Sequence, residues 1–405
     1  MTPRGRGLLI LLLLASLLLR LGWGWSRPAT EKSLADLPDQ VEYLACARSL
    51  AGLAQGASFG FIDPRFGQFV YAQRTPGYPA FIALCGGNIP AVRIVQALID
   101  VSTILAVFLI ARKWLCERRA LFAAGLVAVN PMLVYFSGLL LTETLYTAML
   151  VWSIYLLVNR RCIFTAIFLL AISVLVRPSG LPFVILLPLV SGWLVGPGAS
   201  ARRGMGYGLL GAAVLAIVLL PWAVRNRQVL GNWVWLSSNS GITLYDGVWE
   251  NAQGNSDQRF LDQMTGLRAL GEVGRDRLFN RLANDEISKD PLRFGVLGVN
   301  KILRTWSPIP LSSQFGSNRL YRVAGLAYCL PLWLLALAAF AWSHLPSQMR
   351  TLLIMPALVI TLLHAISVGS MRYRLPAEPL LAVLAASAGK PRRGESSLGA
   401  RQKNQ

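Results

Sequence analysis

The sequence of 405 residues is 54% hydrophobic and only 14% charged, and its mean hydropathy is +0.51. Soluble domains carry about a quarter charged residues, so this composition predicts an all-α polytopic membrane protein. The net charge of +20 does not indicate nucleic-acid binding, because the basic residues lie in short clusters between apolar segments and not in one stripe.

Ten apolar segments are long enough, or nearly long enough, to cross a bilayer as helices. We expect them at about 7–25, 90–111, 119–137, 140–158, 163–176, 180–196, 206–224, 321–342, 351–369 and 375–389. The first resembles a signal peptide with a basic head. Trp23, Trp25 and Arg27 stand where a small-residue cleavage site would follow, so we expect a retained signal-anchor helix.

The fifth and sixth segments are short, and Pro178 and Pro182 lie at the boundary between them. They could therefore be two spans, one broken unit or a pair of re-entrant pieces.

Basic residues in the short connections set the expected orientation of the chain. They are Arg4, Arg6, Arg112, Lys113, Arg118, Arg119, Arg160, Arg161, Arg202, Arg203 and Arg350. All fall on one side, which should be the cytoplasm. We expect one membrane domain over 1–389, with long extracytoplasmic connections at 26–89 and 225–320. The basic stretch 390–405 has no apolar residues to pack and should form a disordered cytoplasmic tail.

The five cysteines and two histidines show no metal-binding spacing, so no metal ligands are assigned. Cys46 and Cys85 share the outer compartment in the expected topology, which leaves a disulfide between them open.

Three acidic residues lie where the expected topology meets the outer membrane surface. Asp39 and Glu42 are one helical turn apart just after the first span, where a carboxylate could deprotonate an acceptor hydroxyl or hold a metal ion. The alternative is two solvated acids on a surface helix. Glu143 lies at the outer end of the fourth span and is either a functional-site residue or a helix-start acid with Thr142 as its cap.

Six arginines flanked by proline or aromatic residues lie on the same expected face. They are Arg74, Arg177, Arg225, Arg227, Arg372 and Arg374. A guanidinium presents a planar fork of donors that matches phosphate oxygens. We favour a clamp for a lipid-linked phosphate over separate contacts with lipid headgroups.

The connection 225–320 opens with NWVWLSSNSGITLYDGVW, a mixture typical of loops that line a polar pocket, and Asn239 lies within it. A charged, helix-like run follows. Phe260, Leu261, Met264 and Leu267 recur at helical spacing there, so one face should pack on the membrane domain. In the penultimate span, His364 is interpreted as a hydrogen-bonded helix residue.

Seven short motifs occur in a distinctive order along the chain. They are Asp-x-x-Glu-Tyr, Arg-Thr-Pro-Gly-Tyr-Pro, Thr-Glu, Val-Arg-Pro-Ser-Gly, Pro-Trp-x-x-Arg-Asn, Ser-Asn-Ser-Gly and Arg-Tyr-Arg-Leu-Pro. In this order they resemble the bacterial membrane glycosyltransferases of the GT-C superfamily, in the family-39-like branch of protein mannosyltransferases and the lipid A aminoarabinose transferase. The resemblance extends from Met1 to about Ala388.

The resemblance implies a GT-C-like bundle of about ten transmembrane helices in the bacterial inner membrane. It implies inverting transfer of a sugar from a polyprenyl-phosphate donor to an extracytoplasmic protein, lipid or cell-envelope glycan. Asp39 would be the catalytic base, with Glu42 and Glu143 as further catalytic candidates. The candidate donor- and substrate-binding residues are Tyr43, Arg74, Tyr78, Arg177, Arg225, Asn239, Arg372 and Arg374. A divalent cation is possible, although Gln40 stands where many members carry a second acid.

Two other functions remain open at this point. A polysaccharide polymerase or ligase would use a lipid-diphosphate donor. A transporter or flippase of lipid-linked sugars would need inverted repeats and ionisable residues deep in several spans, and Glu143 and His364 are the candidates for such positions.

Overall fold

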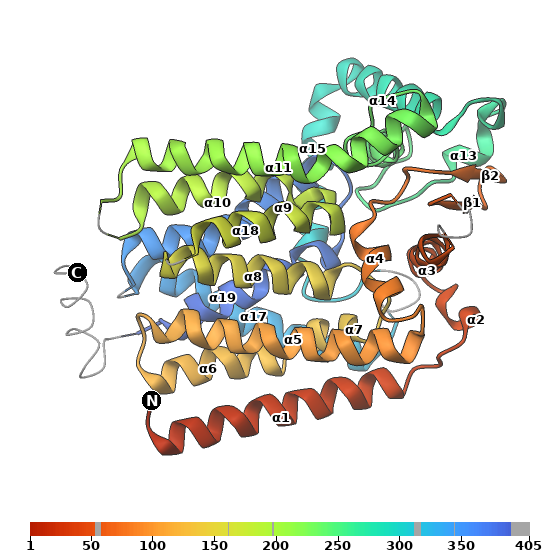
Figure 1. Cartoon of the computed structure of the whole chain (residues 1–405). Helices are drawn as coiled ribbons and strands as arrows, with labels where there is room; N and C mark the ends of the chain where they lie inside the picture. The colour runs from red at the N-terminus through yellow and green to blue at the C-terminus, as the bar shows by residue number, and fades with distance from the viewer. Residues whose placement is uncertain (53–57, 161, 197, 312–316, 344, 390–405) are drawn as a thin grey trace.

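The computed structural model describes residues 1–52, 58–160, 162–196, 198–311, 317–343 and 345–389. Long helices lie side by side in one bundle, and two short strands gather with several short helices at one end (Figure 1). The N-terminus lies at the opposite end of the bundle (Figure 1). The predicted all-α polytopic membrane fold is thus confirmed. The expected tail at 390–405 lies outside the described residues.

The bundle is built from eleven of the described helices. They are α1 (Pro3–Trp25), α5 (Ile89–Arg112), α6 (Glu117–Ala128), α7 (Pro131–Ser137), α8 (Glu143–Asn159), α9 (Ile163–Val176), α10 (Leu181–Leu194), α11 (Ala201–Leu230), α17 (Arg319–Trp342), α18 (Ser347–Ile366) and α19 (Glu378–Ala386). Their ends follow local chemistry. The Asn88 side chain, for example, accepts the Ala91 N–H at the start of α5, and Gly231 takes up a φ of +67° where α11 ends.

Among the described helices, five are long and apolar enough to cross a bilayer: α1, α5, α11, α17 and α18. The pair α6 and α7, bent by 53°, would make a sixth span. The bend occurs at Asn130 and Pro131, because proline lacks an N–H and the Asn130 side chain accepts the next two N–H groups. A helix forms in each of the ten expected segments, but α8, α9, α10 and α19 are shorter than these spans.

Proline-containing 3-10 turns shorten several of these helices. α9 and α10 are separate helices joined by the 3-10 turn η2 (Pro178–Gly180). The last expected span begins as the 3-10 helix η4 (Met371–Ala377), which leaves α19 only nine residues.

The short elements at the other end come from the two long connections. They are α2 (Glu31–Leu34), α3 (Pro38–Ala51), β1 (Phe61–Asp63), β2 (Gln68–Val70), α4 (Gly77–Leu84), α12 (Ser240–Asp246), α13 (Phe260–Gln263), η3 (Leu267–Ala269), α14 (Glu272–Lys289) and α15 (Pro291–Thr305). The strands pair antiparallel with Phe61 opposite Val70.

The helix-like run expected after residue 259 breaks early: α13 ends at Gln263, Met264 is extended, and Gly266 adopts a φ of +78°. Phe260 and Leu267 are buried in a cluster of their own with Trp249 and Phe279, separate from the core of the bundle. The expected packing of this face on the membrane domain is therefore wrong, and these residues form the core of the outer elements.

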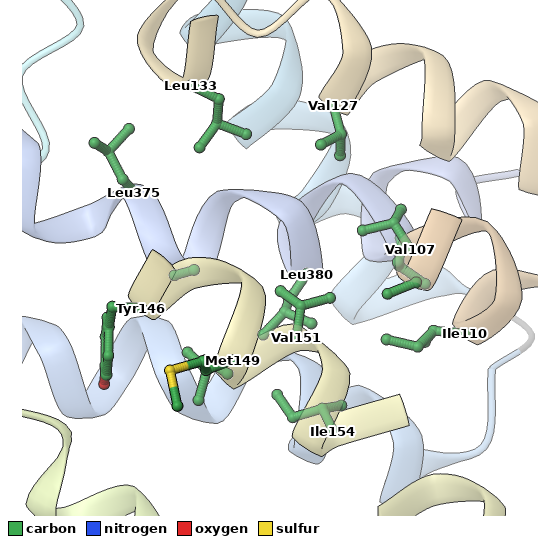
Figure 2. Close-up of a cluster of buried hydrophobic side chains, with 14 of the residues drawn as sticks. Val107, Ile110, Val127, Leu133, Tyr146, Met149, Val151, Ile154, Leu375 and Leu380 are labelled. Carbon is green, nitrogen blue, oxygen red and sulfur yellow. The ribbon is translucent and has the colours of Figure 1, made fainter. Parts of the chain in front are cut away.

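The largest hydrophobic core lies inside the bundle. Val107 of α5, Val127 of α6, Met149 of α8 and Leu380 of α19 all belong to it, and Figure 2 shows their side chains gathered in one interior. This core holds the helix ends that carry the polar residues described below.

A buried ion pair joins α1 to the bundle. Arg20 pairs with Asp100 of α5 and donates to the carbonyl oxygen of Ala128 at 3.0 Å. That carbonyl lies at the end of α6, where the break before α7 leaves it without a helical partner. Arg20 therefore fixes α1 against the bent pair.

Candidate functional site

A cavity of about 170 Å³ lies where the outer elements meet the bundle. Six of the candidate residues line it: Asp39, Tyr43, Arg74, Glu143, Arg177 and Arg372. They come from α3, from the turn before α4, from the start of α8, from the end of α9 and from η4. We call it the ion-pair cavity.

Asp39 lies between two arginines in this cavity. Its Oδ1 accepts a hydrogen bond from Arg74 Nη2 at 2.5 Å, and its Oδ2 accepts one from Arg372 Nη1 at 2.8 Å. Each oxygen of the carboxylate therefore has its own guanidinium.

The pairing continues in both directions from Asp39. Glu42 Oε2 accepts from Arg74 Nε at 2.7 Å. Glu143 Oε1 lies 3.1 Å from Arg177 Nη1 and 3.6 Å from Arg372 Nε. Three carboxylates and three guanidiniums thus alternate as one ion-pair chain whose formal charges cancel.

Local sequence explains how these side chains meet. Pro38 opens α3, so Asp39 and Glu42 lie one turn apart on a helix and both reach Arg74. Arg177 precedes Pro178, which disfavours helical geometry, and its φ of −145° and ψ of 110° end α9 there.

Glu143 is the first residue of α8 and is only 2% exposed. The helix start favours a negative charge there. Thr142 makes no side-chain capping bond, and its hydroxyl instead accepts from Arg177 Nη1 at 3.3 Å. The acid is therefore paired with arginine and is not a simple capped helix start.

Aromatic rings pack against the arginines of the cavity. The Arg74 guanidinium carbon lies 5.1 Å from the ring centre of Tyr43, which packs edge-on against Tyr78 at 5.0 Å. Tyr78 is fully buried and donates to Gln96 Oε1 at 2.7 Å, so it is held in place where it contacts Tyr43. Tyr373 lies 5.2 Å from the guanidinium carbon of Arg177.

The ion pairs set the protonation state of the cavity. Burial alone would raise the pKa of the Asp39 carboxyl, but the charges and hydrogen bonds of Arg74 and Arg372 outweigh it and hold that pKa well below its usual range. Burial raises the pKa of the Tyr43 hydroxyl to about 12. Asp39 is therefore ionised, and it is a weak base as long as both arginines contact it.

Two of the candidate arginines do not reach the ion-pair cavity. Arg225 donates to the carbonyl oxygens of Phe59 and Tyr71, each at 2.7 Å, and so holds the chain around β1 and β2. Arg374 is fully buried, pairs with Glu378 at 2.8 Å and donates to two backbone carbonyls. Neither residue lines the ion-pair cavity, where the clamp was expected, and the donors named here are engaged by backbone carbonyls and, for Arg374, by Glu378 as well.

Asn239 does not line the ion-pair cavity. Its Nδ2 is 3.4 Å from the hydroxyl of Thr243, which does line it.

Several lining residues were not assigned from the sequence. His364 and Tyr373 line the cavity and stack on each other, with ring centres 3.8 Å apart and an interplanar angle of 11°. The position of Tyr373 between two arginines of one motif was an available signal. Thr243 and Ser367 carried none.

Gln40 has a role that an acid could not fill. Its Oε1 accepts the Leu140 N–H at 2.9 Å, and its Nε2 donates to the carbonyl oxygen of Leu34 at 3.4 Å. An ionised carboxylate can only accept. Gln40 therefore holds α3 against the turn that leads to α8.

The donor set does not fit a divalent cation. In the part of the chain that the structure describes, no three His, Cys, Asp or Glu side chains are placed to hold a metal ion. Each of the three carboxylates of the ion-pair chain is also paired with an arginine. Cys46 and Cys85 are both free, so the disulfide left open above does not form.

Residues 78–224 match the family model described as dolichyl-phosphate-mannose-protein mannosyltransferase. No curated protein matches the sequence.

Solved structures of the archaeal oligosaccharyltransferase AglB from Archaeoglobus fulgidus have a similar fold. One, in complex with an inhibitory peptide and a dolichol-phosphate, superimposes with a TM-score of 0.54 at 15% identity, over 95% of this chain and 50% of that one. Another, tethered to an acceptor peptide, gives a TM-score of 0.56 at 14% identity, over 99% and 53%. This chain spans about half the length of the solved structures that it matches.

The chain therefore shares the fold of these solved structures, and its residues 78–224 match the mannosyltransferase family model.

Proposed function

We propose that this protein is an inverting glycosyltransferase that moves a sugar from a polyprenyl-phosphate donor to an acceptor outside the cytoplasm. The observation that carries the proposal is the position of Asp39 between Arg74 and Arg372 in a cavity that also holds Glu143 and Arg177. The acceptor would be a protein, a lipid or a cell-envelope glycan.

The donor phosphate would bind at Arg177 and Arg372. Both guanidiniums line the ion-pair cavity, and Tyr373 lies against both of them. An arginine pair can hold phosphate oxygens and stabilise the charge that grows on the phosphate as it leaves. Once Arg372 turns toward the phosphate, one oxygen of Asp39 loses its partner and becomes a better base.

The transfer step needs no reactant besides the donor and the acceptor. The acceptor oxygen or nitrogen attacks the anomeric carbon from the face opposite the phosphate, and its proton passes to Asp39. The bond between the anomeric carbon and the phosphate oxygen breaks, and the lipid phosphate leaves with the electron pair. Inversion at the anomeric carbon follows from this single displacement.

We further propose that the protein lies in the bacterial inner membrane, with its membrane domain over 1–389 and the connections 26–89 and 225–320 outside. The N-terminus and the short elements at opposite ends of the bundle support this orientation (Figure 1). Both termini would then be cytoplasmic.

A polymerase or ligase with a lipid-diphosphate donor would use the same arginines, so donor choice separates it from the proposal. Transport is less well supported, because the buried pair of Arg20 and Asp100 is engaged in holding helices together. Ionisable residues of a transport pathway would instead face a route across the membrane.

The test supplies membranes containing the protein with labelled sugar on a polyprenyl monophosphate, a polyprenyl diphosphate or a nucleotide. We expect the monophosphate donor alone to be consumed, with a product of inverted anomeric configuration. Consumption of the diphosphate donor alone would favour the polymerase or ligase. If no lipid-linked sugar is consumed, the enzyme class itself is wrong.

A further inference from the structure

A second cavity, of about 500 Å³, lies among the outer elements. Its walls are residues 249–253, α13 and the start of α15, and we call it the polar cavity. Its lining includes the side chains of Trp249, Glu250, Gln253, Gln263, Arg259 and Arg293.

The polar cavity has fixed walls. Arg293 of α15 donates to the carbonyl oxygens of Val248, Trp249 and Glu250 at 2.8, 2.7 and 2.8 Å. On the other side of this stretch, Asp246 accepts hydrogen bonds from the Ser256 hydroxyl and the Asp257 N–H, both at 2.6 Å. The backbone of the wall is therefore held from α15 and from the following loop.

The groups around the polar cavity suit a neutral, hydroxyl-rich ligand. Gln253 and Gln263 are exposed and each offers donors and an acceptor, and Glu250 adds a carboxylate. Trp249 is 3% exposed, and its indole N–H has no hydrogen-bond partner among the described residues. Sugar hydroxyls both donate and accept, which matches such a set of groups better than a single charged ligand would.

A phosphate ligand fits this cavity less well. Arg259 is already paired with Asp257 at 2.5 Å, and Arg293 donates hydrogen bonds to three backbone carbonyls. Neither guanidinium presents a free fork to an anion.

The polar cavity is tied to the ion-pair cavity through the backbone. Thr243 of α12 lines the ion-pair cavity, and the chain from there runs directly into the wall of the polar cavity. Gly247 lies so close to the carbonyl of Ser367 that a Cβ would overlap it. The carbonyl oxygen of Gly254 accepts the Gly369 N–H at 2.8 Å, three residues before Arg372.

We propose that the polar cavity binds a neutral saccharide portion of the acceptor and so holds the acceptor beside the ion-pair cavity. The proposal rests on the proposed glycosyltransferase function, because it assigns one substrate of that reaction. The acceptor would then be a glycan or a glycolipid, and the residues that recognise it lie outside the ion-pair chain.

The test measures binding of neutral trisaccharides, mannotriose and maltotriose, to the purified full chain in lipid nanodiscs by saturation-transfer NMR. The variants are Gln253→Ala combined with Gln263→Ala, and Trp249→Phe, which keeps an aromatic ring but removes the five-membered ring of the indole with its N–H. Trp233→Phe is the matched control, because Trp233 is exposed, stacks on Trp235 and does not line the polar cavity. Thermal unfolding of each variant checks that the fold is retained.

We expect at least one trisaccharide to bind, and the Kd to rise by fivefold or more in both cavity variants and to stay constant in the control. No binding by the unaltered protein, or binding that survives the cavity substitutions, would overturn the proposal. Displacement of the trisaccharide by a polyprenyl-phosphate sugar would assign the cavity to the donor, and displacement by a serine-rich peptide would assign it to a protein acceptor. Either result would also overturn it.

This binding does not require sugar transfer, so the two proposals can fail separately. Saccharide binding without consumption of any lipid-linked donor would remove the proposed function. Donor consumption without saccharide binding at the polar cavity would remove only this inference.

Discussion

Arg372 donates to Asp39 Oδ2 at 2.8 Å, although the two residues lie 333 positions apart in the chain. Arg372 belongs to η4 at the end of the bundle, and Asp39 belongs to α3, which follows the first helix. The contact joins Asp39, the proposed base, to Arg372, which is proposed to bind the donor phosphate. The pKa of Asp39 therefore depends on whether Arg372 is engaged by phosphate.

Replacing Arg372 or its near neighbour Arg374 by alanine should affect different properties, donor binding for Arg372 and stability for Arg374. We expect Arg372→Ala to raise the KM for the donor tenfold or more, because a charge-assisted bond to phosphate is lost. Arg374→Ala leaves Glu378 buried without its counter-ion, which we expect to lower the free energy of unfolding by about 3–5 kcal/mol. Donor kinetics and thermal unfolding of both variants measure the difference. A rise in donor KM for a folded Arg374→Ala variant would contradict the assignment.

Arg225 should act on the outer loop and not on the donor. Because it holds the carbonyls of Phe59 and Tyr71, we expect Arg225→Ala to speed proteolytic cleavage within 58–72 severalfold. Limited proteolysis followed by mass spectrometry locates the cut. The donor KM should change less than twofold, and Arg227→Ala, at an exposed position on the same helix, serves as the control. An unchanged cleavage rate would show that Arg225 does not hold this segment.

The two arginines on Asp39 predict a pH dependence of stability. The pKa of Asp39 is lowered in the folded protein, so the unfolded chain binds the proton first as pH falls. The stabilisation is therefore fully present above the unfolded pKa of about 3.9 and is lost as the pH falls below it. The difference in Tm between the unaltered protein and Asp39→Asn should be constant from pH 5 to 7 and should shrink below pH 4. A difference that grows on acidification would contradict the ion-pair geometry.

An apolar stripe on α15 should lie in the membrane interface. Leu292, Val296 and Leu303 are 84%, 62% and 65% exposed, and their spacing places them on one side of the helix. The opposite side carries the buried residues Leu297 and Lys301. An apolar helix face next to membrane spans is stabilised by insertion at the headgroup boundary.

A fluorophore on Val296→Cys in nanodiscs should therefore be quenched by lipid-attached nitroxides. The same fluorophore on Asp285→Cys, an exposed position on α14, should not be. The native cysteines Cys85, Cys116 and Cys162 would be replaced by serine for this measurement. Equal quenching at both positions would mean that α15 does not lie at the membrane.

Composition and the lengths of apolar runs were enough to predict the membrane fold, because a helix that crosses lipid must be apolar over most of its length. They could not predict the break between α6 and α7. That break depends on Asn130 and Pro131 within an otherwise apolar run, and on Arg20 from a different helix to satisfy the freed carbonyl.

The candidate site was predictable to the extent that charge near a span is costly and therefore informative. Asp39, Arg74 and Glu143 were singled out in this way, and all three line the ion-pair cavity. Arg225 and Arg374 share the same flanking residue types, yet backbone carbonyls from distant segments use their donors. A single sequence gives no sign of such contacts, because they depend on how the chain folds back in space.

The most direct test of the account separates donor binding from transfer at Asp39. Asp39→Asn is compared with Asp36→Asn, an exposed acid in the same outer segment, using labelled polyprenyl-phosphate sugar and protein in nanodiscs. If Asp39 is the base, Asp39→Asn should still bind the donor while the rate of transfer falls on the order of 100- to 10,000-fold. Asp36→Asn should transfer at the unaltered rate. Undiminished transfer by Asp39→Asn would contradict the central claim.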